Sequence, residues 1–197
     1  MQAIRNNDYP ALLAQEATLA PDAKRLFRQA ALWGRLEMCQ WLHATYFHTC
    51  GNIDVRADYN YALRRAVENN HLAMCEWLHA TYGLTAADAR ASNNYALRWA
   101  ARRGHLAVCQ WLHATYGLTA ADARDDSNHA LCTAVDNGRL AVCQWFHATY
   151  DLTAADWKPH LVHAPTAVAT WIRGLKLKAR LRALAAELTA LADKIVE

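Results

Sequence analysis

The sequence predicts an all-α protein, a helical-repeat solenoid that ends in a C-terminal amphipathic helix. The block Trp-Leu-His-Ala-Thr-Tyr occurs at 41–46, 77–82 and 111–116, and it recurs at 145–150 with Phe146 as its second residue. The blocks begin 36, 34 and 34 residues apart, a period typical of repeat proteins whose units bury their apolar faces against one another. After Gly174, leucines spaced four and three residues apart indicate a long helix with one apolar seam.

Composition favours a globular protein. The chain has 197 residues, of which 54% are hydrophobic and 20% charged, with only 7 Gly and 4 Pro. The net charge of +3 is too small to imply nucleic-acid binding by itself. No apolar stretch is long enough for a transmembrane helix, and the N-terminus does not read as a signal peptide. The 6 cysteines show no Cys-x-x-Cys pair, so we expect a reducing intracellular compartment, the cytoplasm or nucleus, that of a host cell included.

Each repeat reads as two helices. In the copy that starts at Tyr95, the residues Leu97, Ala100 and Ala101 form one apolar stripe. Gly104 then ends the first helix, and the second runs from about His105 to Tyr116 with apolar residues on two sides. The same helix-ending position is filled by Gly34, Asn70, Gly104 and Gly138.

The connectors between repeats carry a helix-start signal. Thr119 and Asp122 have the spacing of a capping box, and the pair recurs as Thr85/Asp88 and Thr153/Asp156. This pattern predicts a short helical turn rather than a β-hairpin. The first connector, 47–59, is two residues longer and contains Gly51-Asn52, either a contact loop or a neutral insertion.

These patterns divide the chain into four parts. Residues 1–23 read as an N-terminal half-repeat cap, and 24–157 hold four repeats. Residues 158–174 read as a degenerate C-terminal half-repeat, and 175–197 form the amphipathic leucine-heptad helix. Terminal caps are what a repeat array needs to shield its two end faces.

The segment 96–108 resembles the ankyrin repeat. Leu97, Ala100, Ala101, Gly104 and His105 match the family's pattern, and the resemblance covers 24–157. Tyr95-Ala96 stands in place of the family's Thr-Pro, and the Trp-Leu-His blocks look like those of divergent ankyrin proteins of large DNA viruses and protists. The resemblance implies ankyrin-like repeats that bind proteins through the first helices and fingers, without enzyme chemistry.

Two columns of reactive side chains repeat in register, one of histidines and one of cysteines. Neighbouring helices pack ~8–10 Å apart, whereas metal ligands lie ~2 Å from the ion, so register-matched residues cannot easily share a metal. The same spacing disfavours disulfides. We expect both columns to be structural, with no metal, no cofactor and no catalytic residue. Their members are His43, His79, His113, His147, Cys39, Cys75, Cys109 and Cys143.

Positions that vary between copies indicate where a partner could bind. On the first helices, three positions lie opposite the apolar stripe, and they are rich in the Trp and Arg side chains that dominate binding hot spots. The alternative is a solvated charged face with one tryptophan folded onto its neighbour. The candidate partner-binding residues are Trp33, Arg65, Glu68, Trp99, Arg102, Arg103 and Asp136.

The C-terminal seam must be covered by something. One interpretation is that the helix folds back over the last repeat as a cap, and the other is antiparallel self-pairing. The first half of the helix is basic and the second mildly acidic, which suits antiparallel partners. The candidate oligomerisation residues are Leu177, Leu181, Leu184, Leu188, Leu191 and Ile195.

Three functions are consistent with these features. The first is a scaffold that binds a protein partner through the first-helix face. The second is a structural subunit that assembles through the C-terminal helix in a larger complex or virus particle. The third, nucleic-acid binding through arginines of the first helices and the basic run 173–182, is weaker because the net charge is low and acidic residues interrupt the patch. These arginines are Arg64, Arg65, Arg98, Arg102 and Arg103.

Overall fold

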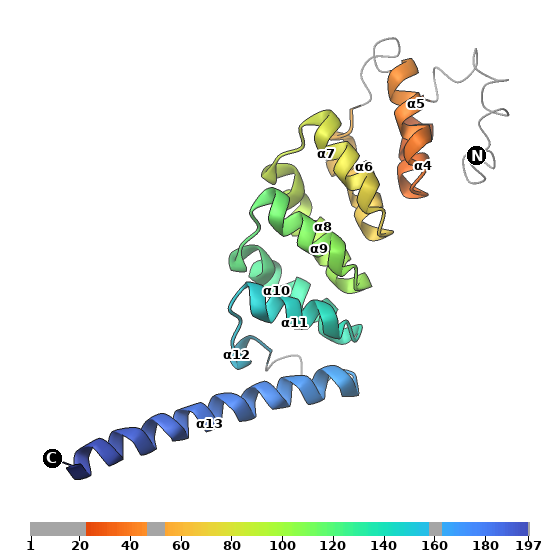
Figure 1. Ribbon diagram of the computed structural model, residues 1–197. Coiled ribbons are helices and arrows are strands. Elements are labelled where there is room, and N and C mark those ends of the chain that lie inside the picture. The colour runs from red at the N-terminus through yellow and green to blue at the C-terminus, as the bar shows by residue number, and fades with distance from the viewer. Residues whose placement is uncertain (1–22, 47–53, 158–162, 197) are drawn as a thin grey trace.

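Helix pairs stack one on the next along the chain in the computed structural model, which describes residues 23–46, 54–157 and 163–196 (Figure 1). The first helices of successive repeats, α4, α6, α8 and α10, contact one another in order. No strand occurs in these three ranges, which confirms the all-α solenoid. The helices are α4 (Ala23–Leu32), α5 (Leu36–Tyr46), α6 (Ala57–Glu68), α7 (Leu72–Tyr82), α8 (Ala86–Arg103), α9 (Leu106–Tyr116), α10 (Ala120–Asp136), α11 (Leu140–Thr149), α12 (Ala154–Trp157) and α13 (Thr166–Val196).

The core runs continuously between the two rows of helices. In α8, Leu97 and Ala100 are fully buried, and in α9 Cys109 and Leu112 are fully buried as well. The apolar stripes that the sequence shows are therefore the faces that the helices bury. Because each second helix meets its own first helix and its neighbours, it needs apolar side chains on more than one side.

The connectors are helical, as the capping boxes predict. Thr85 and Asp88 start α8 with a complete capping box, and Thr119 and Asp122 start α10 in the same way. Left-handed backbone at Ser92–Asn94, with φ of 53–56°, then bends α8, so that its first turns form the connector and the rest forms the first helix of the repeat. The expected loop signal at Gly51-Asn52 lies outside the described residues.

The helix-ending positions adopt the backbone that was expected of them. Gly34, Asn70, Gly104 and Gly138 have φ between 62° and 84°, the left-handed region that glycine and asparagine tolerate best. The residues that follow Asn70 and Gly138 each donate a hydrogen bond to a backbone carbonyl near the end of the preceding repeat's first helix. His71 donates from Nε2 to the Leu32 carbonyl at 3.1 Å, and Arg139 donates from Nε to the Arg102 carbonyl at 3.0 Å.

A ladder of ion pairs joins the connectors, here called the arginine–aspartate ladder. The aspartate of each capping box accepts hydrogen bonds from an arginine one repeat earlier in the chain. Each rung fixes the distance between two neighbouring repeats. The rungs are Arg56–Asp88 at 3.2 Å, Arg90–Asp122 at 2.6 Å and Arg124–Asp156 at 3.0 Å.

The C-terminal region differs from the division that its sequence predicts. One helix, α13, runs from Thr166 to Val196, and no break occurs at Gly174. A glycine inside a helix is tolerated when the residues on both sides favour the helix, as the leucine, lysine and alanine residues here do. Val168 and Ile172 in its first turns are fully buried against the stack. The rest of α13 extends past the last repeat (Figure 1). Of the N-terminal half-repeat at 1–23, only Ala23 is described.

Candidate protein-binding surface

The first-helix face is the outer side of α4, α6, α8 and α10, on which the predicted partner-binding residues lie. Trp33 is 43% exposed, and Arg102, Arg103 and Asp136 are exposed. Arg65 is half-buried. Four of the seven candidates are thus exposed, whereas Trp99 is half-buried like Arg65 and Glu68 is buried, which corrects the expectation that Trp99 and Glu68 lie fully in solvent.

Glu68 is buried and belongs to the contact between two repeats. Its carboxylate accepts a hydrogen bond from Arg65 Nη1 at 2.5 Å and another from Arg103 Nη2, one repeat later, at 3.1 Å. Burial alone would lower the pKa of Arg65, but the hydrogen bond to Glu68, the charge of that carboxylate and the neighbouring Tyr61 together outweigh burial and raise the pKa. The sequence places Glu68 opposite the apolar stripe, yet α8, the first helix of the next repeat, covers it. Its role is to hold two arginines in place.

Trp99 is half-buried rather than fully exposed. Arg102 lies over its ring with the guanidinium carbon 4.7 Å from the ring centroid, and Arg103 lies at 5.7 Å. The Tyr95 ring packs beside it at 5.5 Å. The tryptophan is thus folded onto its neighbours, which was the alternative interpretation, but it also orients two arginines that face solvent.

Three arginines occupy the same position in successive first helices, and we call them the arginine column. They are Arg28, Arg64 and Arg98. Arg28 stacks on Tyr61 at 5.7 Å, and Arg64 stacks on Tyr95 at 4.6 Å, so each lies on an aromatic ring of the next repeat. Sequence reasoning missed the tyrosines. The signal was present, because the arginines are spaced by the same 36 and 34 residues as the repeated blocks.

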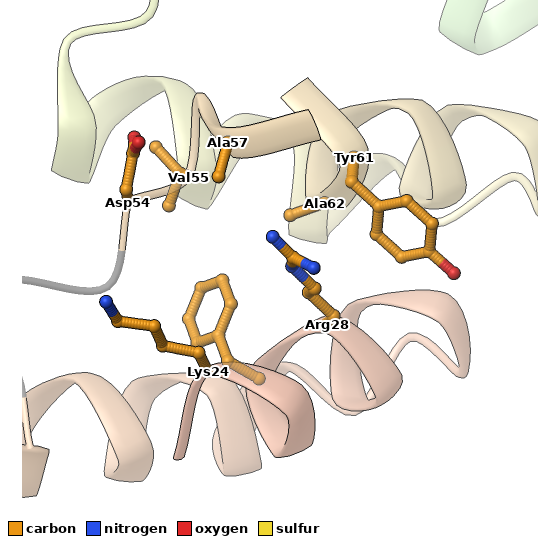
Figure 2. Close-up of a pocket in the computed structure, with 8 residues that line it drawn as sticks. Lys24, Arg28, Asp54, Val55, Ala57, Tyr61 and Ala62 are labelled. Carbon is orange, nitrogen blue, oxygen red and sulfur yellow. The ribbon is translucent and has the colours of Figure 1, made fainter. Parts of the chain in front are cut away.

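Two shallow hollows lie along this face. One, of about 190 Å³, is lined by Arg98, Trp99, Arg102, His129 and Thr133. The other, of about 220 Å³, lies between α4 and α6, where Lys24 and Arg28 rise from α4 toward Val55 and Tyr61 (Figure 2). Arg28 also pairs with Asp58 at 2.6 Å. Both hollows are bordered by cationic and aromatic side chains.

The electrostatic balance of the first-helix face is positive. The arginine column, Arg102 and Arg103 supply cations, whereas Glu68 is buried in its pairs and Asp58 is paired with Arg28. Asp136 lies at the far end of the face, at the end of α10. The surface therefore suits an acidic partner more than a basic one.

The cysteine and histidine columns lie inside the stack. Cys39, Cys75, Cys109 and Cys143 are buried, and burial raises the pKa of each thiol, to about 12 for Cys143. Nδ1 of His43, His79 and His113 hydrogen-bonds to protein atoms, as when His113 Nδ1 donates to the Leu118 carbonyl at 2.7 Å. Among the described residues, no group of three His, Cys, Asp or Glu side chains could hold a metal ion.

The leucines of α13 are not covered by the last repeat. Leu177, Leu181, Leu184 and Leu188 are 45–68% exposed. The capping interpretation therefore fails for this part of the helix, because the helix axis carries it past the stack. The side chains of Leu191 and Ile195 lie outside the described part of the chain.

Comparison with known proteins identifies the repeats. Two family models, described as ankyrin repeats in three and in many copies, match residues 63–156 and 26–79. No curated protein and no solved structure matches the chain. Across the described ranges, no helix is both long enough and apolar enough to cross a membrane.

Proposed function

Because this chain is an ankyrin-repeat protein, we propose that it is a scaffold that binds an acidic partner protein through its first-helix face. Ankyrin repeats generally mediate protein–protein interaction, and proteins built from them are typically non-enzymatic interaction modules. The finer assignment, to one face and to one kind of partner, rests on the contacts of the arginines.

The observation that carries this proposal is that the arginines are held in place before any partner arrives. Arg64 is stacked on Tyr95, and Arg102 is stacked on Trp99. A free arginine side chain would lose about 0.5–1.5 kcal/mol of rotamer freedom on binding, and prior stacking reduces that loss. Arginine and tryptophan are also the residue types most enriched among binding hot spots.

Photo-crosslinking tests which face binds. A photoreactive amino acid at position 102 should crosslink the partner in an extract of the native source. The same group at position 110, which is exposed on the second helix α9, should not. The crosslinked segment of the partner should be rich in Asp and Glu. Equal crosslinking from both positions, or crosslinks to nucleic acid, would reject this assignment.

Affinity measurements then test the side chains. Arg102→Ala removes an exposed side chain and should weaken the complex by about 1–2 kcal/mol without changing the melting temperature. Trp99→Ala should weaken it by ~2 kcal/mol or more, together with some loss of stability because the ring is half-buried. Gln110→Ala is the matched control and should leave the affinity unchanged. Full affinity in the folded Arg102→Ala and Trp99→Ala proteins would move the site elsewhere.

A second candidate function is that of a structural subunit that assembles through α13, in a larger complex or a virus particle. The exposed leucines favour it, because a row of large apolar side chains is rarely left in water. Residues 173–182 carry five basic side chains, and 183–197 carry Glu187, Asp193 and Glu197 against Lys194. An antiparallel pair would set each basic half against an acidic half, whereas a parallel pair would set like charges together.

Light scattering with two matched variants decides this candidate. Leu184→Asp introduces a charge into the seam, and Ala186→Asp introduces the same charge on the other side of the same helix. A dimer that Leu184→Asp converts into a folded monomer, and that Ala186→Asp leaves intact, would support the structural-subunit function. A wild-type monomer at ~100 µM would exclude self-pairing of useful strength.

The location that we propose is a reducing intracellular compartment, the cytoplasm or the nucleus. The unpaired thiols of the cysteine column support it, because disulfides form and persist mainly in oxidising compartments, whereas thiols are kept reduced in the cytosol and nucleus. Fractionation of the native source under conditions that preserve organelles tests this location.

A further inference from the structure

A repeated cluster of three rings joins each repeat to the next. In each of the first three repeats, the register histidine makes edge-to-face contacts with a tryptophan and a tyrosine of the following repeat. His79, for example, lies 6.3 Å from the Trp111 ring and 5.3 Å from the Tyr116 ring. His113 lies 5.8 Å from Trp145 and 5.5 Å from Tyr150. The tyrosine follows the tryptophan by five residues each time.

The last cluster lacks its tyrosine. His147 meets Trp171 of α13 at 5.7 Å, so α13 supplies the tryptophan of a following repeat. Five residues later, however, the chain has Lys176 instead of tyrosine. In the inner repeats the second helix ends within a residue of this tyrosine and the chain turns into the connector, whereas α13 continues straight on. The tyrosine and the connector that would follow it are therefore absent here, and Trp171 packs edge-to-face on the buried Trp157 ring instead, at 5.3 Å.

A cavity of about 530 Å³ occupies this place. It is bordered by His147 and Trp171, by the connector at Leu152 and Thr153, and by Leu175 and Arg182 of α13. The volume is within the range of about 300–1,000 Å³ that is usual for ligand sites. His147 Nδ1 is buried there without a hydrogen-bond partner, whereas the same atom of His79 donates to the Leu84 carbonyl at 2.9 Å.

Charge indicates the chemistry of the occupant. Lys178 and Arg182 both border the cavity, and Asp151 is the single acid in the lining. Arg173 and Lys176 on the same helix add to the positive potential. The leucines of the exposed seam lie on another side of α13, because residues 177, 181, 184 and 188 are well separated around a 3.6-residue turn from 175, 178, 179 and 182. The cavity is thus independent of the seam.

We propose that this end cavity binds a tyrosine flanked by acidic residues in a partner protein. The ring would take the place that Tyr116 and Tyr150 fill in the inner repeats, between a histidine and a tryptophan. The flanking carboxylates would pair with Lys178 and Arg182. The site is separate from the first-helix face, so either can be correct without the other.

A labelled peptide tests the proposal directly. The probe is an eight-residue peptide with one central tyrosine among glutamates, followed by fluorescence anisotropy with the full chain in 0.15 M salt. We expect saturable binding that weakens by at least about tenfold when the peptide tyrosine becomes alanine, and by a similar factor in the Arg182→Glu protein. Arg180→Glu is the matched control, because it makes the same charge change on α13 outside the cavity, and it should change the affinity by no more than about twofold.

A gain-of-contact variant gives an independent readout. Lys176→Tyr restores the five-residue spacing of the inner repeats, so the new tyrosine ring should fill the cavity. This variant should have a higher urea midpoint than the wild type, and its affinity for the peptide should be lower by about tenfold or more. The proposal is overturned if no saturation occurs up to about 1 mM peptide, if the tyrosine-free peptide binds equally well, or if Arg180→Glu weakens binding as much as Arg182→Glu does.

Discussion

Replacing Asp122 by alanine should destabilise the protein more than is usual for a charged residue in a connector between repeats. The side chain is only 9% exposed and accepts four hydrogen bonds. Two come from Thr119, from its backbone N at 2.8 Å and its Oγ1 at 3.1 Å. The other two come from Arg90, from Nε at 2.6 Å and Nη2 at 3.0 Å. Burial alone would raise the pKa of Asp122, but these donors outweigh it and lower the pKa.

The magnitude follows from the two roles of this carboxylate. Loss of a helix N-cap interaction costs about 1 kcal/mol. The Arg90 side chain is 38% exposed, so water can partly replace the lost ion pair, and that pair contributes about 1 kcal/mol at most. The partly buried donors that lose their acceptor carry a further cost, so the expected total loss is about 2–3 kcal/mol in the free energy of unfolding. At about 2–4 °C per kcal/mol for a domain of this size, the melting temperature should fall by about 4–12 °C.

Urea unfolding followed by circular dichroism measures this loss. Asp136→Ala is the control, because Asp136 is exposed near the end of the same helix, where its removal should cost almost nothing. Asp122→Asn should recover part of the loss, since its amide oxygen can still accept from Thr119. If Asp122→Ala cost no more than Asp136→Ala, the arginine–aspartate ladder would contribute nothing to stability, and our account of how the repeats are joined would be wrong.

Three further predictions concern pH, packing and metal. The hydrogen bond from Arg124 lowers the pKa of Asp156 to about 2, so the contribution of Asp156 to stability is complete above about pH 4 and disappears as the pH falls toward 2. The difference in unfolding free energy between the wild type and Asp156→Asn should therefore shrink over that interval. A constant difference would contradict the assignment. Leu112→Ala should cost about 2–5 kcal/mol because the side chain is fully buried, whereas Gln110→Ala should cost under ~0.5 kcal/mol, and equal small losses would mean that the helix register is wrong. The melting temperature should be the same with and without EDTA or a reductant, and a fall of many degrees with either would reveal a metal or disulfide that stabilises the fold.

Local patterns in the sequence predicted most of the helical architecture. Gly104 and its counterparts end the first helices because the left-handed backbone depends on the residue at that one position. Thr119 and Asp122 start a helix because a capping box closes within four residues. The stripe of Leu97, Ala100 and Ala101 is buried because period alone places those side chains on one side of a helix.

The candidate site was only partly predictable, because some of its contacts depend on a residue's own helix and others join two repeats. The sequence identified Arg102 and Arg103 as solvent-facing, since their own helix turns them away from the core. It misplaced Glu68, because the residue that covers and pairs with it, Arg103, lies 35 positions later in the chain. It left the partners of the arginine column unassigned, because the ring that Arg64 stacks on belongs to the next repeat.

By itself, the sequence determined what depends on neighbours within one or two helical turns: the helices, their ends, the repeat and the leucine seam. Only the tertiary structure decided what depends on the packing of one repeat against another. It joined Arg90 to Asp122 across 32 residues, and it brought Trp171 to His147 at the end of the stack. It also carried Leu184 into solvent rather than onto the last repeat, because a continuous α13 cannot fold back. Side-chain period states which face of a helix is apolar, but the path of the whole chain decides what that face meets.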